Sequence, residues 1–329
     1  MPSVDRRRPA TLAVFGALAM SLWLACNSKL PEGEEIGEIR LALNWFPEAE
    51  HGGYYGAAVH GEFESRSLNM KILGGGPDAP VIQRVAGGSV HFGITNADGV
   101  INARAAGAPV VALLAPYQVN PRCIMVHESS GIEHIDEIAN LTLALSQRPA
   151  FSHYLRWKLE FPGVTFVPYH GSVAPFLRDS LYAQQGYVFS EPVIARRQGT
   201  QPRALLVSET GFNPYASVLV TTQEILRSQP KLVREVVVAS LRGWERYLDT
   251  PEPINQYIHS LNPEMDMEIL SEGARQSVAL VLSGDALESG LGTMTRSRWD
   301  NLLRQMEEAG IVAPGQVAPE ACFTLEFLP

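Results

Sequence analysis

The stretch IRLALNWFPEAEHGGYYGAAVH, residues 39–60, carries the pattern that decides the fold. Its first five residues alternate crudely between inward and outward types, which predicts a β-strand. A loop rich in aromatic and polar side chains follows at 44–50, and 52–60 then reads as a helix. Strand, loop and helix recur in this order along the chain, which predicts βαβ units around a mostly parallel sheet.

Outward from this stretch, two successive α/β units and a helical ending can be followed. In the first unit we expect strands at 70–73, 90–94 and 110–115, with helices at 79–86 and 98–106. In the second we expect strands at 123–127, 141–146, 164–169 and 186–189, with helices at 151–159 and 173–180. A strand at 218–220 then precedes helices at 222–248, broken at Pro230, and at 253–261, 267–282 and 297–309.

The simplest packing of this order is two lobes, between which the chain crosses twice. We expect one lobe to comprise residues 38–118 plus 216–329, and the other residues 119–215. The crossings at 117–121 and 211–215 are short, polar and proline-containing, which suits hinges. A chain of 329 residues is long enough for two such units.

Composition excludes some classes of partner. The net charge is −9, and a mildly acidic protein repels nucleic acid and anionic lipid headgroups. We therefore expect no nucleic-acid partner. Apolar residues make up 46% of the chain, enough for two hydrophobic cores.

The N-terminal residues have the pattern of an export signal. Three arginines at 6–8 precede an apolar stretch at 10–25, which is shorter than a membrane-spanning helix and suits a signal peptide. The stretch ends at Cys26 and resembles a bacterial lipoprotein signal. We predict a signal peptide at 1–26, lipidation at Cys26 and a tether at 27–37, so that a lipid anchor holds a periplasmic or cell-surface protein to the membrane. An ordinary signal peptide and an uncleaved anchor are the alternatives.

Two further cysteines, Cys123 and Cys322, either form a disulfide, which export permits, or stay as two free buried thiols. There is no CxxC motif and no cluster of cysteine and histidine, so we expect no metal site.

Candidate ligand contacts follow from the rule that ligands of open α/β sheets bind outside the carboxyl ends of the strands. Flat aromatic faces and polar groups suited to a small-molecule pocket follow several predicted strands. The candidates are Asn44, Trp45, Glu48, His51, Tyr54, Asn96, Asp98, Gln118, Ser146, Ser190 and Glu191. Some have a structural alternative: Asn44, Asn96 and Asp98 could cap helices or turns, and His51 could be a satisfied structural histidine.

The run from Leu43 to Glu48, with the HGGYY segment at 51–55, resembles the opening of the thiamine-pyrimidine-precursor-synthase-like ABC-transporter solute-binding proteins. The segments at 92–98, 105–111 and 190–192 also match this family. The resemblance covers about residues 39–260 and implies a two-lobed, Venus-flytrap fold of the second periplasmic-binding-protein class.

The resemblance also implies a function. It implies a monomer that captures a small molecule, such as a pyrimidine or a related flat nitrogen heterocycle, for an ABC permease, without catalysis or a cofactor. In the pyrimidine-binding relatives, aromatic residues sandwich a flat ring and a carboxylate holds its N–H groups. Trp45, Tyr54 and Glu191 stand where those roles would fall, and Glu48, Asn96 and Gln118 could complete the set.

Two other functions stay open at this point. A binding protein could pass its ligand signal to a membrane receptor. A pyrimidine-precursor synthase shares this architecture, but the cysteine-rich iron-binding motif of such enzymes is missing here. Neither a GxSxG nor a HExxH motif occurs in the chain.

Overall fold

The computed structural model describes residues 37–329 apart from residue 78, and Gly37–Pro329 form one compact unit. The predicted signal peptide at 1–26, the lipidated Cys26 and residues 27–36 of the tether lie outside the described residues. Within the described part, no helix combines the length and the apolar character that crossing a membrane requires.

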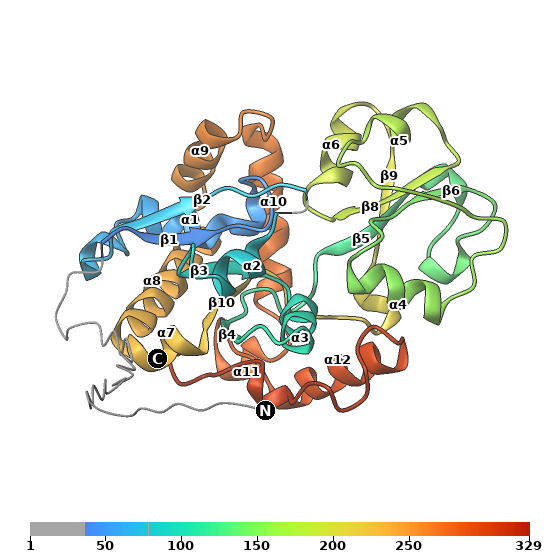
Figure 1. Ribbon diagram of the computed structural model, residues 1–329. Helices are drawn as coiled ribbons and strands as arrows, with labels where there is room; N and C mark the ends of the chain where they lie inside the picture. The colour runs from blue at the N-terminus through green and yellow to red at the C-terminus, as the bar shows by residue number, and fades with distance from the viewer. Residues whose placement is uncertain (1–36, 78) are drawn as a thin grey trace, which may run out of the picture. The chain divides into compact units, whose positions relative to one another are not determined.

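The first sheet has the strand order β2-β1-β3-β10-β4 (Figure 1). Its strands are β1 (Ile39–Ala42), β2 (Met70–Leu73), β3 (Phe92–Thr95), β4 (Val110–Leu114) and β10 (Val218–Thr222). The helices α1 (Gly52–Val59), α2 (Val81–Ala86) and α3 (Ala97–Ala105) connect the first four strands. β10 is antiparallel to both of its neighbours, because the chain re-enters the sheet after crossing back.

The second sheet has the order β7-β6-β8-β5-β9. Its strands are β5 (Arg122–His127), β6 (Thr142–Ala144), β7 (Thr165–Val167), β8 (Tyr182–Tyr187) and β9 (Pro202–Leu206). The helices α4 (Ala150–Lys158), α5 (Ala174–Arg178) and α6 (Glu191–Arg197) lie between them in sequence. Here β5 is antiparallel to both neighbours. Each sheet is therefore mixed, yet four of its five strands share one direction, as a mostly parallel sheet requires.

Helices complete the chain after β10. They are α7 (Gln223–Ser228), α8 (Pro230–Asp249), α9 (Glu252–Leu261), α10 (Met267–Val281), α11 (Ala286–Ser289) and α12 (Arg296–Glu308). Short 3-10 turns occur at Ala49–His51, Glu64–Arg66, Glu128–Ser130, Ile135–Glu137, Val207–Thr210 and Pro319–Ala321. Pro230 is the first residue of α8, so the predicted break in the long helical segment is confirmed.

Two features of the second sheet differ from the sequence analysis. The strand expected at 186–189 is β8, Tyr182–Tyr187, which ends two residues earlier, and Glu191 begins α6. Pro192 at the second helical position explains the difference, since proline fits the first turn of a helix. The edge strand β9 was not expected.

The two segments that cross between the sheets are joined by hydrogen bonds. Tyr117 and Ala216 form an isolated antiparallel bridge. The backbone N–H of Asn120 donates to Oδ1 of Asn213 at 2.8 Å, and Nδ2 of Asn120 donates to the carbonyl of Pro214 at 2.9 Å. The crossings therefore lie side by side.

The guanidinium of Arg298, on α12, forms hydrogen bonds with both crossings. Nη2 of Arg298 donates to the carbonyls of Gln118 at 2.7 Å and Asn213 at 3.0 Å. The group also lies 3.8 Å from the ring centre of Tyr215, a cation–π distance.

The core beside the first sheet depends on the close approach of α1 to α8. Gly53 on α1 and Gly243 on α8 permit this approach. A Cβ added at Gly243 would lie 2.1 Å from the carbonyl oxygen of Gly53 and 2.3 Å from the backbone nitrogen of Ala57. Trp244, fully buried, packs edge-on against Tyr54 at 5.8 Å between ring centres.

We expect Gly243→Ala to lower the free energy of unfolding by about 3 kcal/mol, because backbone atoms cannot yield as a flexible side chain can. The gain in helix propensity, about 1 kcal/mol, does not offset this. Urea denaturation measures the difference, and Gly37→Ala, where an added Cβ meets nothing within 4 Å, is the control. Equal free energies of unfolding in the two variants would show that α1 and α8 can move apart without loss of stability.

Cys123 and Cys322 are both buried and free. Burial raises the pKa of both thiols, to about 11 for Cys322, so each is kept protonated. Of the two alternatives, the structure shows free thiols.

Candidate functional site

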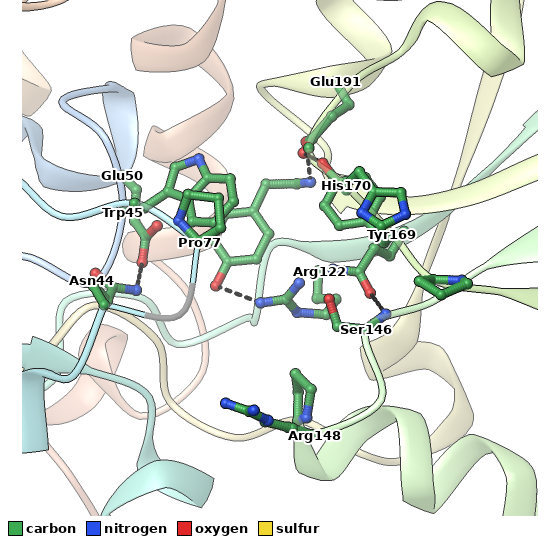
Figure 2. A pocket seen from close by; sticks show the side chains of 18 of the residues that line it. Asn44, Trp45, Glu50, Pro77, Arg122, Ser146, Arg148, Tyr169, His170 and Glu191 are labelled. Carbon is green, nitrogen blue, oxygen red and sulfur yellow. Dashed lines mark hydrogen bonds between the residues drawn. The ribbon is translucent and has the colours of Figure 1, made fainter.

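A cavity of about 420 Å³ is lined by loops that come from both sheets (Figure 2). The loop 44–50 follows β1, and residues 76–79 follow β2. On the other side, residues 146–149 follow β6, residues 168–171 follow β7, and Glu191 follows β8. The site thus lies at the carboxyl ends of strands, as the rule for open α/β sheets predicts.

Aromatic side chains lie on both sides of the cavity. Trp45 comes from the loop after β1, whereas Tyr169, His170 and Tyr187 come from the second sheet and its loops. The segment after β7 passes directly beside the indole, because a Cβ added at Gly171 would lie 3.9 Å from that ring. Aromatic rings from both sheets therefore border one cavity.

Carboxyl groups on the first-sheet side are buried and shifted toward their neutral form. Burial raises the pKa of Glu50 to about 7, against the hydrogen bond from Asn44 and the charge of Arg122, which lower it. Burial and the neighbouring Glu50 raise the pKa of Glu48 well above its ordinary value. Glu50 can therefore accept or donate a hydrogen bond near neutral pH.

A short polar chain orients Glu50. Nδ2 of Asn44 donates to Oε1 of Glu50 at 3.2 Å, and Oδ1 of Asn44 lies 2.9 Å from Nε2 of His51. Burial lowers the pKa of His51 to about 3, so this ring is neutral and donates from Nε2. The hydrogen bond with His51 thus orients the amide of Asn44, and this amide in turn orients the carboxyl group of Glu50.

Glu191 borders the cavity, but its own side of the protein already engages both oxygens. The hydroxyl of Tyr169 donates to Oε1, and the backbone N–H of Tyr187 donates to Oε2 at 2.8 Å. Glu191 thereby holds Tyr169 in place and closes the turn between β8 and α6.

Arg122 places a positive charge opposite these carboxyl groups. Its guanidinium lies 4.6 Å from the ring centres of both Phe151 and Tyr187. Nη2 of Arg122 donates to the hydroxyl of Tyr187 at 3.2 Å, and the same hydroxyl accepts from Nδ2 of Asn96 at 3.2 Å. The charge is thus held rigidly, with an aromatic ring on each flank.

The structure separates the predicted site residues into groups. Those that line the cavity are Asn44, Trp45, Glu48, Ser146 and Glu191. Asn96 and Asp98 line a smaller neighbouring cavity, which Arg122 also borders. His51 and Ser190 lie behind the wall: His51 supports Asn44, and the Ser190 hydroxyl donates to Oε2 of Glu48 at 3.0 Å.

Two further predicted residues line neither cavity. Tyr54 is fully buried, and its hydroxyl donates to the carbonyl of Ser217 at 2.6 Å, because its face of α1 packs toward α8. Nε2 of Gln118 donates to the carbonyls of Ala115 and Thr293, and Oε1 accepts from Arg298, so this side chain braces the crossing.

Sequence reasoning missed several residues that line the cavity. Glu50, Arg122, Tyr169 and Tyr187 are the main ones. Arg122 begins an antiparallel strand, so a search of strand carboxyl ends passes over it. Its place directly after a predicted crossing is the signal that could have pointed to it. Among the described residues, no group of three or more histidine, cysteine and acidic side chains could hold a metal ion.

Two mixed sheets flanked by helices, with a cavity between loops of both, define the periplasmic-binding-protein fold, as solved structures confirm. The periplasmic aliphatic sulphonate binding protein SsuA of Escherichia coli superposes with a TM-score of 0.65 at 16% identity, over 86% of this chain and 91% of that one.

The family profile described as NMT1/THI5 like matches residues 48–254, and the chain belongs to this family. The riboflavin-binding protein RibY of Chloroflexus aurantiacus is 25% identical over 89% of this chain and 87% of that protein. A formylaminopyrimidine-binding protein of Halalkalibacterium halodurans is 19% identical over 92% of this chain and 95% of that protein. The family predicted from the motifs is confirmed.

Proposed function

We propose that this chain is the extracytoplasmic solute-binding component of an ABC importer, and that it captures a flat nitrogen heterocycle between two lobes without catalysing a reaction. The observation that carries the proposal is the cavity itself, lined by loops of both sheets. A volume of about 420 Å³ lies within the usual range of small-molecule sites.

Capture follows from the arrangement of the chain. The lobes are residues 38–118 plus 216–329 and residues 119–215, and the paired crossings near Tyr117 and Asn213 act as the hinge. A ligand that touches both walls stabilises the closed form by its higher affinity for that form. The closed form then docks on a permease, and the N-terminal segment keeps the protein at the membrane outside the cytoplasm.

The walls favour a flat heterocycle with hydrogen-bonding groups on opposite edges. Trp45 and Tyr169 supply aromatic faces for its ring. Glu50 accepts from N–H groups on one edge, while Arg122 donates to carbonyl or ring-nitrogen acceptors on the other. An analogue that lacks these groups leaves buried protein groups without partners and is rejected.

A thermal-shift screen of the purified protein tests this proposal. The panel contains aminopyrimidines, flavins, alkanesulfonates and amino acids. A ligand that binds only the folded state raises Tm with its concentration, by RT ln(1 + [L]/Kd) in free energy. We expect a saturating rise with at least one flat heterocycle. A rise with sulfonates or amino acids alone would contradict the proposed ligand class.

A further inference from the structure

The helix α10 begins far from the two crossings and ends beside them. At its C-terminal end, the backbone N–H groups of Gln118 and Val119 both donate to the carbonyl of Leu280 at 3.0 Å. The helix has 15 residues, which at a rise of about 1.5 Å per residue span about 22 Å. One end of α10 is thus fixed at the proposed hinge, and the other end, at Asp266, lies about 22 Å away from it.

Ion pairs join this far end of α10 to α6 (Figure 1). Nη2 of Arg197, in the last turn of α6, lies 3.1 Å from Oδ2 of Asp266, and its Nη1 donates to Oε2 of Glu268. The other oxygen of Asp266 accepts from the backbone N–H groups of Glu268 at 3.1 Å and Ile269 at 3.0 Å. Because this N-cap orients the Asp266 carboxylate, Arg197 meets a partner that is already held in place.

Further charges extend the contact along both helices. The charge of Arg196, beside Arg197 on α6, acts on Glu272, one turn further along α10, although Arg275 of the same helix is the main partner of Glu272. The helix α6 lies within residues 119–215, whereas α10 lies within residues 216–329. These charges therefore face each other across the boundary between the two proposed lobes.

The distance from the hinge makes this contact sensitive to opening of the lobes. A rotation of about 15°, a size known for such transitions, moves a point about 22 Å from the axis by about 6 Å. An ion pair is lost at such a separation, because its nitrogen and oxygen must lie within about 4 Å of each other. None of Arg197, Asp266 and Glu268 lines the cavity, so their contact depends on the lobes and not on the ligand.

We propose that Arg197, Asp266 and Glu268 form an interlobe latch, which stabilises the closed form without touching the ligand and thereby sets the affinity of the cavity. This inference rests on the proposed function, since a latch requires lobes that open and close. The three side chains are partly exposed, so the latch is weak and is screened by salt. The ligand-free protein is then a mixture of open and closed forms, and the ligand completes closure.

Pulsed electron spin resonance on the ligand-free protein tests the latch. Spin labels at Gln83→Cys on α2 and Lys158→Cys on α4, in a Cys26→Ser background, report the ratio of closed to open forms. In Arg197→Gln we expect this ratio to fall about 5-fold, which corresponds to about 1 kcal/mol. Raising the salt from about 0.1 M to about 1 M shortens the Debye length from about 10 Å to about 3 Å. The native protein should then shift toward the open form, and Arg197→Gln should respond much less.

Arg296→Gln is the matched control for this experiment. Arg296 also meets two carboxylates, those of Asp300 at 2.7 Å and Glu320 at 3.1 Å, but all three residues belong to the same proposed lobe. The control should keep the native ratio of closed to open forms and the native response to salt. Thermal denaturation checks that each variant folds.

Reversal of the charges separates a latch from a general effect of removing Arg197. Arg197→Glu and Glu268→Arg should each favour the open form, because each places like charges opposite one another. The double variant should recover part of the closed population, since it restores opposite charges at the same place. Glu268 suits this exchange because its side chain is 80% exposed and does not cap α10.

Affinity provides an independent measurement. The apparent Kd is the intrinsic Kd divided by the fraction of protein that can bind. Titration calorimetry with riboflavin, or with the panel compound that raises Tm most, should therefore show a Kd up to about 5-fold higher in Arg197→Gln, and a native Kd in Arg296→Gln.

The outcomes distinguish the latch from the proposed function. A native ratio of forms in ligand-free Arg197→Gln, or an equal shift in Arg296→Gln, would overturn the latch, and capture would stand if the same riboflavin-type compound still shortens the label distance. A distance that no variant, salt concentration or panel compound changes would overturn both the latch and closure of the two lobes.

Discussion

Replacing Trp45 with alanine is expected to weaken the binding of a flat heterocycle by about 10- to 100-fold, and to change the stability of the protein little. Stacking of a base on an aromatic side chain contributes about 1–3 kcal/mol, which corresponds to this loss. Trp45 lies at the cavity and is only partly buried, so its removal leaves no closed void in either hydrophobic core.

Phe46 offers the matched control for this experiment. It is the next residue on the same loop, is 48% exposed and does not line the cavity. Titration calorimetry should therefore find the native affinity in Phe46→Ala and a reduced affinity in Trp45→Ala. Native affinity in Trp45→Ala, or an equal loss in both variants, would show that the indole does not stack on the ligand.

The second large effect concerns stability and pH at Glu50. Its pKa is raised from 4.5 to about 7 in the folded protein, so the folded form holds the proton more tightly than the unfolded chain. Its favourable contribution is therefore complete below pH 4.5 and is lost as pH rises through about 7. The raised pKa corresponds to about 3 kcal/mol.

We accordingly expect Glu50→Gln to stabilise the protein by up to about 3 kcal/mol at pH 8 and to have little effect at pH 4.5. Urea denaturation at both pH values measures the difference, and Glu64→Gln, at an exposed carboxylate, is the control. If the free energy of unfolding of Glu50→Gln depended on pH as that of the native protein does, the pKa of Glu50 would not be raised in the folded state.

Other charged groups face Glu50 and must be considered in that experiment. Glu48, Glu191 and Arg122 all interact with it electrostatically or share its cavity. Nε2 of His51 lies 4.0 Å from Oε2 of Glu50, but the pKa of about 3 of His51 keeps this ring neutral in this range. Because burial raises the pKa of Glu48 as well, Glu48→Gln should be measured beside Glu50→Gln.

Much of the fold could be predicted because each strand and helix carries a local signal. The strand of the opening stretch ends where its polar loop begins, and Pro230 marks the boundary between α7 and α8. Less could be predicted near Glu191. The apolar residues at 186–189 suggest a strand by composition, but the turn into α6 depends on a hydrogen bond from Tyr187 to the Glu191 carboxylate.

Only those site residues that lie at the carboxyl ends of predicted strands could be predicted from the sequence. Asn44 and Trp45 directly follow one predicted strand and Ser146 ends another, and the structure places all three at the cavity. Tyr54 also follows the first strand, but nothing local says which face of α1 packs on α8. Arg122, Tyr169 and Tyr187 come together only through the pairing of distant strands, which one sequence does not specify. The ligand contacts themselves stay predictions.

Closure of the two lobes is tested most directly by the distance between α2 and α4. Pulsed electron spin resonance measures this distance. Spin labels would be placed at Gln83→Cys on α2 and Lys158→Cys on α4, both exposed, in a Cys26→Ser background. The remaining cysteines are buried. We expect saturating riboflavin, or the heterocycle that raises Tm most, to shift the distances to a shorter and narrower distribution. An unchanged distribution at saturation would contradict capture by closure of two lobes.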